Sequence, residues 1–368
     1  MRLSESTMRV FLLIIAISFA TTTNADYKIE MVADNLNFPW SIAFLPDGSY
    51  LVALRVGEVL RVSKEGEVSE PLTGLPASFV ESQGGYFDVM LDPQFETNQI
   101  VYLSFAYGSS ESNGTRIVKG ELAATSVENL QTIFTVHPLK DTAAHYGGKM
   151  LFLDDGSLLM TTGDGFEYRE ASQDTFSQLG KIIRINSDGS VPADNPFSDG
   201  GKGDPKVWSY GHRNPQGLAL DQTTGTVYSH EHGPQGGDEL NSVLPAKNYG
   251  WPAVTQGINY SGAYVSPLRY APGVEEPLTF WVPSIAPSGL AYYEGAVFPD
   301  WSGDLFVGAL VDQDVRRIDL EAGKVVGEES LFAEVGARIR DVRAGPDGYL
   351  YILTDSESGK LLRVVPDY

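Results

Sequence analysis

The chain has 368 residues, of which 42% are hydrophobic and 11% aromatic, and its formal net charge is −22 at pH 7. This composition predicts a compact globular protein, and the negative charge argues against nucleic acid as a partner because phosphate backbones would be repelled. The chain has no cysteine, which excludes disulfide bonds and a covalently attached c-type haem.

The first segment has the pattern of a secretory signal peptide. Arg2 and Arg9 precede an uncharged apolar run from Val10 to Ala20, and small or polar residues follow up to Ala25. The run is shorter than the roughly 20 apolar residues that a membrane span needs. We therefore expect residues 1–25 to be removed and the protein to be exported. A retained membrane anchor is the alternative.

A tight turn followed by alternating apolar residues recurs along the chain. Six copies begin at Pro46, Asp92, Asp154, Thr224, Trp301 and Pro346. Alternation of this kind predicts strands, and the spacing of roughly 45 to 80 residues is typical of propeller blades with variable insertions. Because no Ser-, Pro- or Gly-rich linker divides the chain, we expect residues 26–368 to form a single all-β domain, a six-bladed β-propeller. A β-sandwich or two smaller β domains are the alternatives.

His145 is the first candidate for chemistry. It lies in Ala144-His-Tyr-Gly-Gly-Lys149, directly before an expected strand. The paired glycines let the backbone approach a ligand closely, and a neutral imidazole can accept a proton near pH 7. A histidine in a loop is often structural instead.

A second cluster is rich in glycine and proline and therefore predicts loops. It comprises Trp208 to Leu218, Ser229 to Glu239 and Lys247 to Pro252. Acidic side chains and free carbonyls in such loops are suitable oxygen ligands for Ca²⁺. The spacing of His230 and His232 would also permit a zinc site on a strand, although no general-base motif accompanies it.

Two arginines form the third candidate. Arg338 and Arg340 alternate, so on a strand both side chains point to one side. Two guanidinium groups on one face repel each other unless an anion lies between them, and carboxylates match their forked donors. The alternative is ion pairing with a neighbouring acid such as Asp341 or Glu334.

Several motifs in this order resemble the pyrroloquinoline quinone (PQQ)-dependent soluble glucose and aldose sugar dehydrogenases. The motifs are Gln83-Gly-Gly-Tyr-Phe-Asp88, His145-Tyr-Gly-Gly148, Thr162-Gly-Asp164, Gln178-Leu-Gly-Lys-Ile182, Gly211-His-Arg-Asn-Pro-Gln-Gly217, Glu231-His-Gly-Pro-Gln-Gly-Gly-Asp-Glu239, Asn248-Tyr-Gly-Trp-Pro252, Gly257-Ile-Asn-Tyr260 and Arg338-Ile-Arg-Asp-Val342. The resemblance runs from about Asn35 to Val364.

The resemblance implies a site for PQQ and two calcium ions. The cofactor-binding residues it implies are Gln83, Arg213, Asn214, Tyr260, Ala309, Leu310, Val311, Arg338, Ile339 and Arg340. The backbone carbonyls of Gly233 and Pro234 would bind the calcium beside PQQ, and Glu239 and Tyr249 would hold a structural calcium.

The resemblance also implies a reaction, the oxidation of an aldose at its anomeric carbon to a lactone. In this reading His145 is the general base, Asp164 holds its other ring nitrogen, and Arg213 stabilises negative charge on the quinone oxygen. The electrons then pass to an external acceptor, and the resemblance implies a periplasmic, monomeric protein.

One position departs from the family pattern. Val311 stands where the family usually has a lysine near a carboxylate of PQQ, and Arg316 is a candidate for the replacing cation. Two other functions remain open at this point. They are a calcium-dependent propeller lactonase and a non-catalytic family member that binds sugar or a protein.

Overall fold

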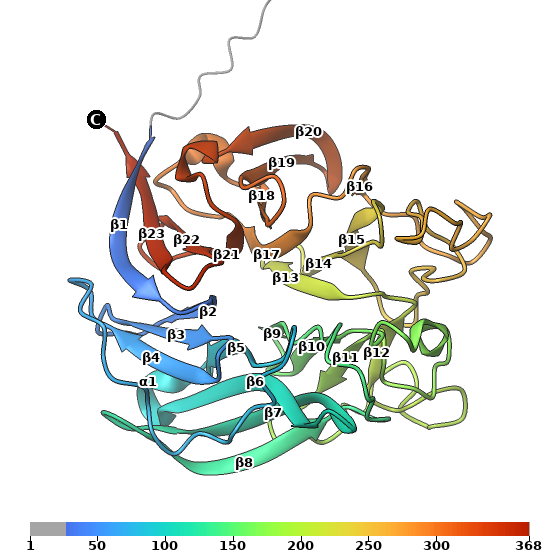
Figure 1. Ribbon diagram of the computed structural model, residues 1–368, viewed down its shortest axis with the longest axis horizontal. Coiled ribbons are helices and arrows are strands. Elements are labelled where there is room, and N and C mark those ends of the chain that lie inside the picture. The colour runs from blue at the N-terminus through green and yellow to red at the C-terminus, as the bar shows by residue number, and fades with distance from the viewer. Residues whose placement is uncertain (1–26, 368) are drawn as a thin grey trace, which may run out of the picture.

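The computed structural model describes residues 27–367, which form six small antiparallel sheets arranged around a central axis, as predicted (Figure 1). The expected signal peptide lies outside the described residues. The helices are single turns: α1 (Phe95–Asn98), η1 (Arg169–Ser172), η2 (Pro299–Trp301) and η3 (Ala333–Val335). Among the described residues, no helix has the length and hydrophobicity that a membrane crossing requires.

Five sheets have four strands and one has three. In chain order the first three sheets are β2 (Pro39–Phe44), β3 (Tyr50–Leu54) and β4 (Glu58–Val62); β5 (Tyr86–Leu91), β6 (Ile100–Ser109), β7 (Ser112–Leu122) and β8 (Val127–Thr135); and β9 (Met150–Phe152), β10 (Leu158–Thr162), β11 (Lys181–Ile185) and β12 (Val207–Tyr210). The last three are β13 (Pro215–Asp221), β14 (Thr226–Glu231), β15 (Asp238–Val243) and β16 (Thr279–Trp281); β17 (Pro287–Tyr292), β18 (Leu305–Ala309), β19 (Val315–Glu321) and β20 (Lys324–Leu331); and β21 (Ile339–Ala344), β22 (Leu350–Thr354), β23 (Gly359–Pro366) and β1 (Tyr27–Leu36).

Each of the six predicted turns joins the first two strands of one sheet. The turn at Pro46 connects β2 to β3, for example, and the turn at Pro346 connects β21 to β22. Gly48 and Gly348 have φ angles of 85° and 83°, a conformation that glycine adopts without steric cost. The repeated turn therefore identifies the six blades correctly.

The ring closes by pairing the two ends of the described chain. Strand β1 runs antiparallel to β23, with Tyr27 opposite Pro366 and Leu36 opposite Gly359. The last blade therefore contains strands from both ends of the chain, which lie side by side in Figure 1. This closure leaves no gap between the first and last blades and compensates for the lack of disulfides.

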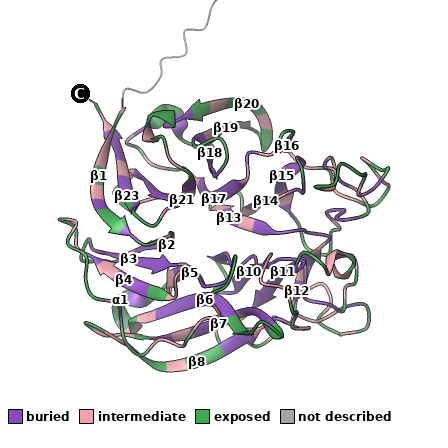
Figure 2. Cartoon of the chain, in the orientation of Figure 1, coloured by how far each residue is buried: buried purple, intermediate pink, exposed green. Residues whose placement is uncertain are grey.

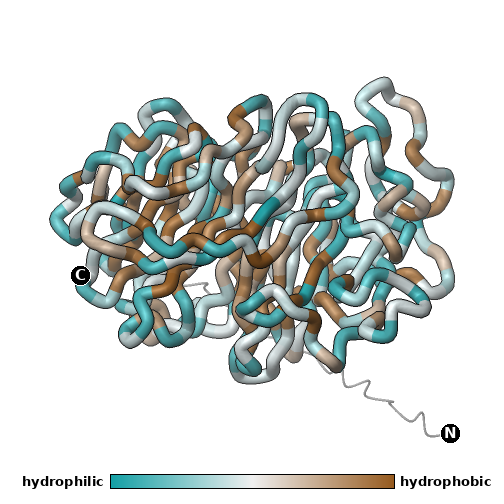
Figure 3. Tube along the Cα trace, turned by 90° about the horizontal axis from the view of Figure 1, so that it is seen from below, coloured by the Kyte–Doolittle hydropathy of each residue, from teal (hydrophilic) through white to brown (hydrophobic). Residues whose placement is uncertain are grey.

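The inner strands are the most buried part of the molecule, whereas β8 and β20 on the outside show many exposed residues (Figure 2). Apolar side chains from adjacent blades fill the space between the sheets. Phe306 of β18, for example, belongs to the same cluster as Val342 of β21 and Ile352 of β22. In the edge-on view of Figure 3, hydrophilic residues are frequent in the loops on both faces of the ring. The loops at one end of the ring carry the candidate site.

Candidate functional site

The propeller topology brings the predicted site residues together at one end of the ring. In each blade the first strand starts, and the antiparallel second strand ends, at the same end of the central axis. Residues just before a first strand and just after a second strand should therefore meet there. Arg213 and Asn214 immediately precede β13, and Val311 closely follows β18, so residues far apart in sequence converge.

A cavity of about 370 Å³ lies at this end. Its lining residues are Trp40, Arg55, Gln83, His145, Arg213, Asn214, Gln216, His232, Tyr260, Ala286, Leu310, Val311, Arg338, Arg340 and Asp355. The volume falls in the range of about 300 to 1,000 Å³ that is common for small-molecule sites. The cavity therefore gathers most of the residues that the sequence implicates in cofactor binding.

His145 and Asp164 form a buried dyad at the cavity wall. The Nδ1 atom of His145 lies 2.6 Å from Oδ1 of Asp164, and Trp251 donates a hydrogen bond of 2.8 Å from Nε1 to Oδ2 of Asp164. Phe166 packs edge-on against the imidazole ring, and its backbone N–H also bonds Asp164. These contacts fix the ring so that its other nitrogen, Nε2, is the one left for a ligand.

Two side chains predicted to bind the cofactor also hold the loop that carries His145. Gln83 Oε1 accepts a 2.8 Å hydrogen bond from the backbone N–H of His145, and Asn214 Oδ1 accepts one of 3.1 Å from Gly147. His145 has a φ of 51°, an uncommon conformation for a residue with a side chain. Gly163 approaches this loop so closely that a Cβ there would lie 2.2 Å from the His145 carbonyl oxygen. The loop is therefore fixed in one conformation by its neighbours.

The surroundings of His145 favour the neutral imidazole. Burial lowers its pKa below the ordinary value of 6.5, and the charge of Arg213 lowers the pKa further. The hydrogen bond and the negative charge of Asp164 oppose this shift. A neutral histidine with one ring nitrogen held by a carboxylate is suited to act as a general base near pH 7.

Arg338, which directly precedes β21, and Arg340, which lies on it, both contact one acid, Asp355. Its Oδ2 atom is 3.2 Å from Nε of Arg338 and 3.1 Å from Nη2 of Arg340. The two acids considered from sequence are not their partners. Asp341 lies on the opposite side of the strand and pairs with Lys149 and Arg343, because side chains alternate along a strand.

Arg213 bridges the cavity and the loop after β14. Its Nη1 atom donates hydrogen bonds of 2.6 Å to the carbonyl of Gly233 and 3.1 Å to that of His232. Its backbone N–H bonds Glu231. The Gly233 carbonyl, an expected calcium ligand, thus accepts a hydrogen bond from a guanidinium here, which leaves one of its two lone pairs for a cation. Pro234 lines a second cavity beside the first.

The other expected calcium site surrounds Glu239 on β15. Burial raises the pKa of Glu239 well above its ordinary value, and the negative charge of Glu231 on the paired strand raises it further. The phenol of Tyr249 bonds the backbone at Ser242 and Leu244, so only the backbone carbonyl of this residue could serve as a metal ligand. A cation at this site would relieve the repulsion between the two glutamates. Within residues 27–367, no group of three or more His, Asp or Glu side chains is arranged to hold a metal.

Some implied residues do not present side chains to the cavity. Ala309 and Ile339 are fully buried in the apolar clusters between blades, so their side chains cannot contact a cofactor there. Arg316 is not the replacing cation, because its guanidinium is bound by Asp312, Asp314 and Glu328 outside the cavity. Val311 does line the cavity and is 56% exposed.

Sequence reasoning missed several lining residues, among them Arg55, His232 and Asp355. Each is the first residue after the second strand of a blade, namely β3, β14 and β22. Their position directly after the second strand of a blade is the sequence signal that could have identified them. Of the two histidines considered for zinc, His230 bonds the Gly289 carbonyl, whereas His232 lines the cavity.

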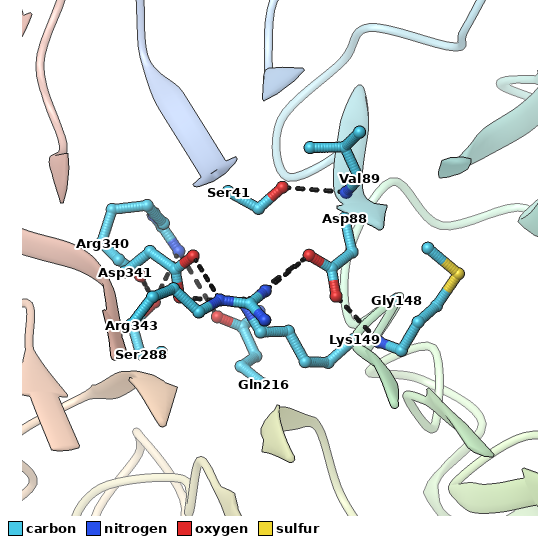
Figure 4. Close-up of polar contacts among 12 residues, drawn as sticks. Ser41, Asp88, Val89, Gly148, Lys149, Gln216, Ser288, Arg340, Asp341 and Arg343 are labelled. Atoms are coloured by element: carbon cyan, nitrogen blue, oxygen red, sulfur yellow. Dashed lines mark hydrogen bonds and ion pairs between the residues drawn. The ribbon is translucent and has the colours of Figure 1, made fainter. Parts of the chain in front are cut away.

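A buried ionic network lies beside the cavity and joins three blades (Figure 4). Lys149 Nζ is 2.9 Å from Oδ1 of Asp341, and Arg343 bonds both Asp341, at 3.0 Å, and Asp88, at 2.7 Å. Asp88 in turn accepts a 2.9 Å hydrogen bond from the backbone N–H of Met150. The network connects the strand of Arg340 to the end of the His145 loop.

Comparison with known proteins supports one family. The family model for glucose / sorbosone dehydrogenases matches residues 36–363. The aldose sugar dehydrogenase YliI of Escherichia coli is 40% identical over 93% of this chain and 94% of its own. The crystal structure of soluble aldose sugar dehydrogenase from E. coli, in the apo form, has a TM-score of 0.89 at 39% identity and covers 93% of this chain and 100% of that chain.

A further solved structure is described as a PQQ-bound form. It is the aldose sugar dehydrogenase of Streptomyces coelicolor, with a TM-score of 0.73 at 29% identity, covering 94% of this chain and 99% of that chain. Family model, relatives and fold agree over nearly all of the described residues. The chain belongs to the glucose / sorbosone dehydrogenase family.

Proposed function

We propose that the protein is a PQQ-dependent dehydrogenase that oxidises an aldose at the anomeric carbon and releases a lactone. The observation that carries the proposal is the position of the His145–Asp164 dyad at the wall of a cavity lined by four arginines. The related E. coli and S. coelicolor proteins, named aldose sugar dehydrogenases, support the substrate class, and the PQQ-bound S. coelicolor structure supports the cofactor.

The lining of the cavity fits PQQ, a planar quinone with three carboxylates. Arg338 and Arg340 present forked donors, and Arg213 adds a third guanidinium beside His145. When bound, PQQ supplies a quinone that accepts a hydride. Arg213 is close enough to the imidazole to affect its pKa, so its charge also acts on negative charge that develops beside His145.

The role of the dyad follows from its geometry. His145 Nε2 takes the proton of the anomeric hydroxyl while the hydride leaves the same carbon, which turns the hemiacetal into a lactone. Asp164 keeps Nδ1 protonated and stabilises the imidazolium that results. The net products are the lactone, two electrons for an external acceptor and two protons, one of which His145 releases.

A second cavity of about 490 Å³ adjoins the first and shares Arg213 and Tyr260 with it. Its lining includes the rings of Phe166 and Trp251 together with Glu167, Glu170 and Asn259. Aromatic rings can pack against the apolar face of a sugar, and the polar groups can hydrogen-bond its hydroxyls. We assign this cavity to the sugar.

We further propose that two calcium ions are required, one at the carbonyls of Gly233 and Pro234 and one at Glu239 and Tyr249. The repulsion between Glu231 and Glu239 supports the second site. We also propose a periplasmic, monomeric protein without a membrane anchor. The pattern of residues 1–25 supports export, and the lack of cysteine, which excludes a covalent haem in the chain, supports a separate electron acceptor.

The proposal is tested by dye reduction with purified, cofactor-free protein and a panel of aldoses, with PQQ and Ca²⁺ added separately and together. Reduction that appears only with both establishes the cofactor requirement and the substrate class. Failure of every sugar, together with no PQQ binding in a titration, would contradict the proposal. Hydrolysis of lactones without PQQ would identify a lactonase instead.

A further inference from the structure

Arg55 is a part of the cavity that none of the sequence motifs includes. It follows β3 directly and lines the same cavity as Arg338 and Arg340. Its Nη1 atom donates a 2.7 Å hydrogen bond to the carbonyl of Ser82, and its guanidinium carbon lies 4.4 Å from the centre of the Phe38 ring. These two contacts hold the guanidinium in place at the wall.

The charge of Arg55 is not balanced inside the described part of the chain. Arg338 and Arg340 share Asp355, whereas no carboxylate of residues 27–367 lies within ion-pair distance of Arg55. Its Nε atom is buried and has no hydrogen-bond partner there. The guanidinium therefore keeps an uncompensated positive charge at the cavity wall, which favours a ligand that supplies a negative charge.

The cavity as a whole has a charge opposite to that of the protein. Its charged lining residues are Arg55, Arg213, Arg338, Arg340 and Asp355, so four guanidinium groups and one carboxylate leave an excess of three positive charges. The complete chain has a net charge of −22. A local excess of positive charge in such an acidic protein favours a ligand with several negative charges.

We propose that Arg55 binds a carboxylate of PQQ and supplies the cation that Val311 cannot. The inference rests on the proposed function, because it assigns a contact to the cofactor proposed there. Val311 is apolar and 56% exposed in the cavity wall, and Arg316 is occupied by three acids elsewhere. Arg55, like Arg213, faces the cavity without a carboxylate partner within the described residues, and it is the guanidinium to which the family resemblance gives no role.

The experiment is a PQQ titration of cofactor-free protein, followed by tryptophan fluorescence in the presence of Ca²⁺ at low and high salt. Arg55→Gln removes the charge but keeps an amide that can donate to the Ser82 carbonyl. Arg61→Gln is the matched control: it lies in the same blade and changes the net charge equally, but its partner is the exposed Asp47. Circular dichroism and thermal unfolding without PQQ establish that each variant is folded.

We expect Arg55→Gln to bind PQQ about 10- to 100-fold more weakly than the wild type, the loss typical of a hydrogen bond to a charged group. Its affinity should also depend less on salt, because one ionic contact is gone. Arg61→Gln should bind normally. If Arg55 acts only by holding the backbone at Ser82 and Gln83, the substitution weakens PQQ binding without changing its salt dependence. That result would overturn the inference.

Two further outcomes separate this inference from the proposed function. If the wild type binds PQQ and Arg55→Gln binds it equally well, the role of Arg55 is refuted and the proposed function still stands. Wild-type protein that does not bind PQQ would refute the proposed function. If Arg55→Gln does not fold, Arg55→Lys replaces it: the charge is kept, so its salt dependence should match the wild type, and a reduced dependence would count against the inference.

Discussion

Lys149 and Asp341 are 192 positions apart in the chain, yet Nζ of the lysine lies 2.9 Å from Oδ1 of the aspartate in the centre of the ring. Lys149 ends the segment that begins with His145, and Asp341 directly follows Arg340. This single ion pair therefore connects the segment of the general base to the strand of the two arginines. Both side chains are at most 1% exposed.

Breaking this pair should destabilise the protein strongly. Lys149→Met leaves Asp341 with only Arg343 in a buried site, and removal of one partner of a buried ion pair typically costs about 3–5 kcal/mol. The free energy of unfolding from urea titration measures the effect. Lys28→Met is the control, because its pair with Glu30 is exposed and should contribute no more than about 1 kcal/mol. Equal losses of unfolding free energy in the two variants would contradict a stabilising role of the buried network.

His145→Gln should abolish most turnover while PQQ remains bound. The substitution removes the proton acceptor, and loss of a general base typically reduces the rate by about 10²- to 10⁴-fold. Dye reduction gives the rate, and the PQQ titration gives the affinity. His137→Gln, at an exposed histidine outside the cavity, should leave both unchanged. Normal turnover by His145→Gln would exclude His145 as the base.

Asp164→Asn should lower the rate and shift its pH dependence. The negative charge of Asp164 raises the pKa of His145 against the effect of burial, so its removal should lower the pKa further. Because the base must be neutral, activity falls as the pH drops through this pKa, and the acidic limb of the rate profile should move to lower pH. Asp141→Asn, whose carboxylate accepts a hydrogen bond from Tyr168, should keep the wild-type profile. A shift to higher pH would contradict the pairing.

Val311→Lys should tighten PQQ binding, because it adds a cation to the wall of the cavity. The expected gain is about tenfold, the effect of one charge-assisted hydrogen bond, and the same titration measures it. Val326→Lys on β20 is the matched control, since that valine is 52% exposed but lies outside the cavity. Unchanged or weaker binding by Val311→Lys would argue against a carboxylate of PQQ near this position.

The number of blades could be predicted from sequence because each blade repeats one local signal. The turns at Pro46 and Pro346 are formed by consecutive residues, and their geometry depends on local features: the proline, the glycine and an aspartate that accepts a hydrogen bond from the backbone two residues on. The pairing of β1 with β23 gives no comparable signal. It joins Tyr27 to Pro366, and such a contact depends on the geometry of the whole ring.

The candidate site likewise combines residues that a local sequence signal reveals with residues that only the fold reveals. His145 and Arg213 lie in motifs that could be recognised, whereas Arg55 and Asp355 follow strands without any distinctive neighbours. The alternative considered for Arg338 and Arg340, an ion pair with an acid, is present, but with Asp355 rather than with Asp341 or Glu334, because proximity in sequence does not decide which face of a strand a side chain occupies. Asp355 reaches Arg338 from the next strand, β22, where it follows Thr354.

The site draws its residues from distant parts of the chain. Asp355 and Arg340 belong to the blade that β1 finishes, while His145 is carried by a loop from the first half of the chain. The cavity between them therefore depends on these blades facing each other in the ring. A ligand that contacts both parts stabilises this arrangement, so its binding free energy adds to the stability of the folded ring.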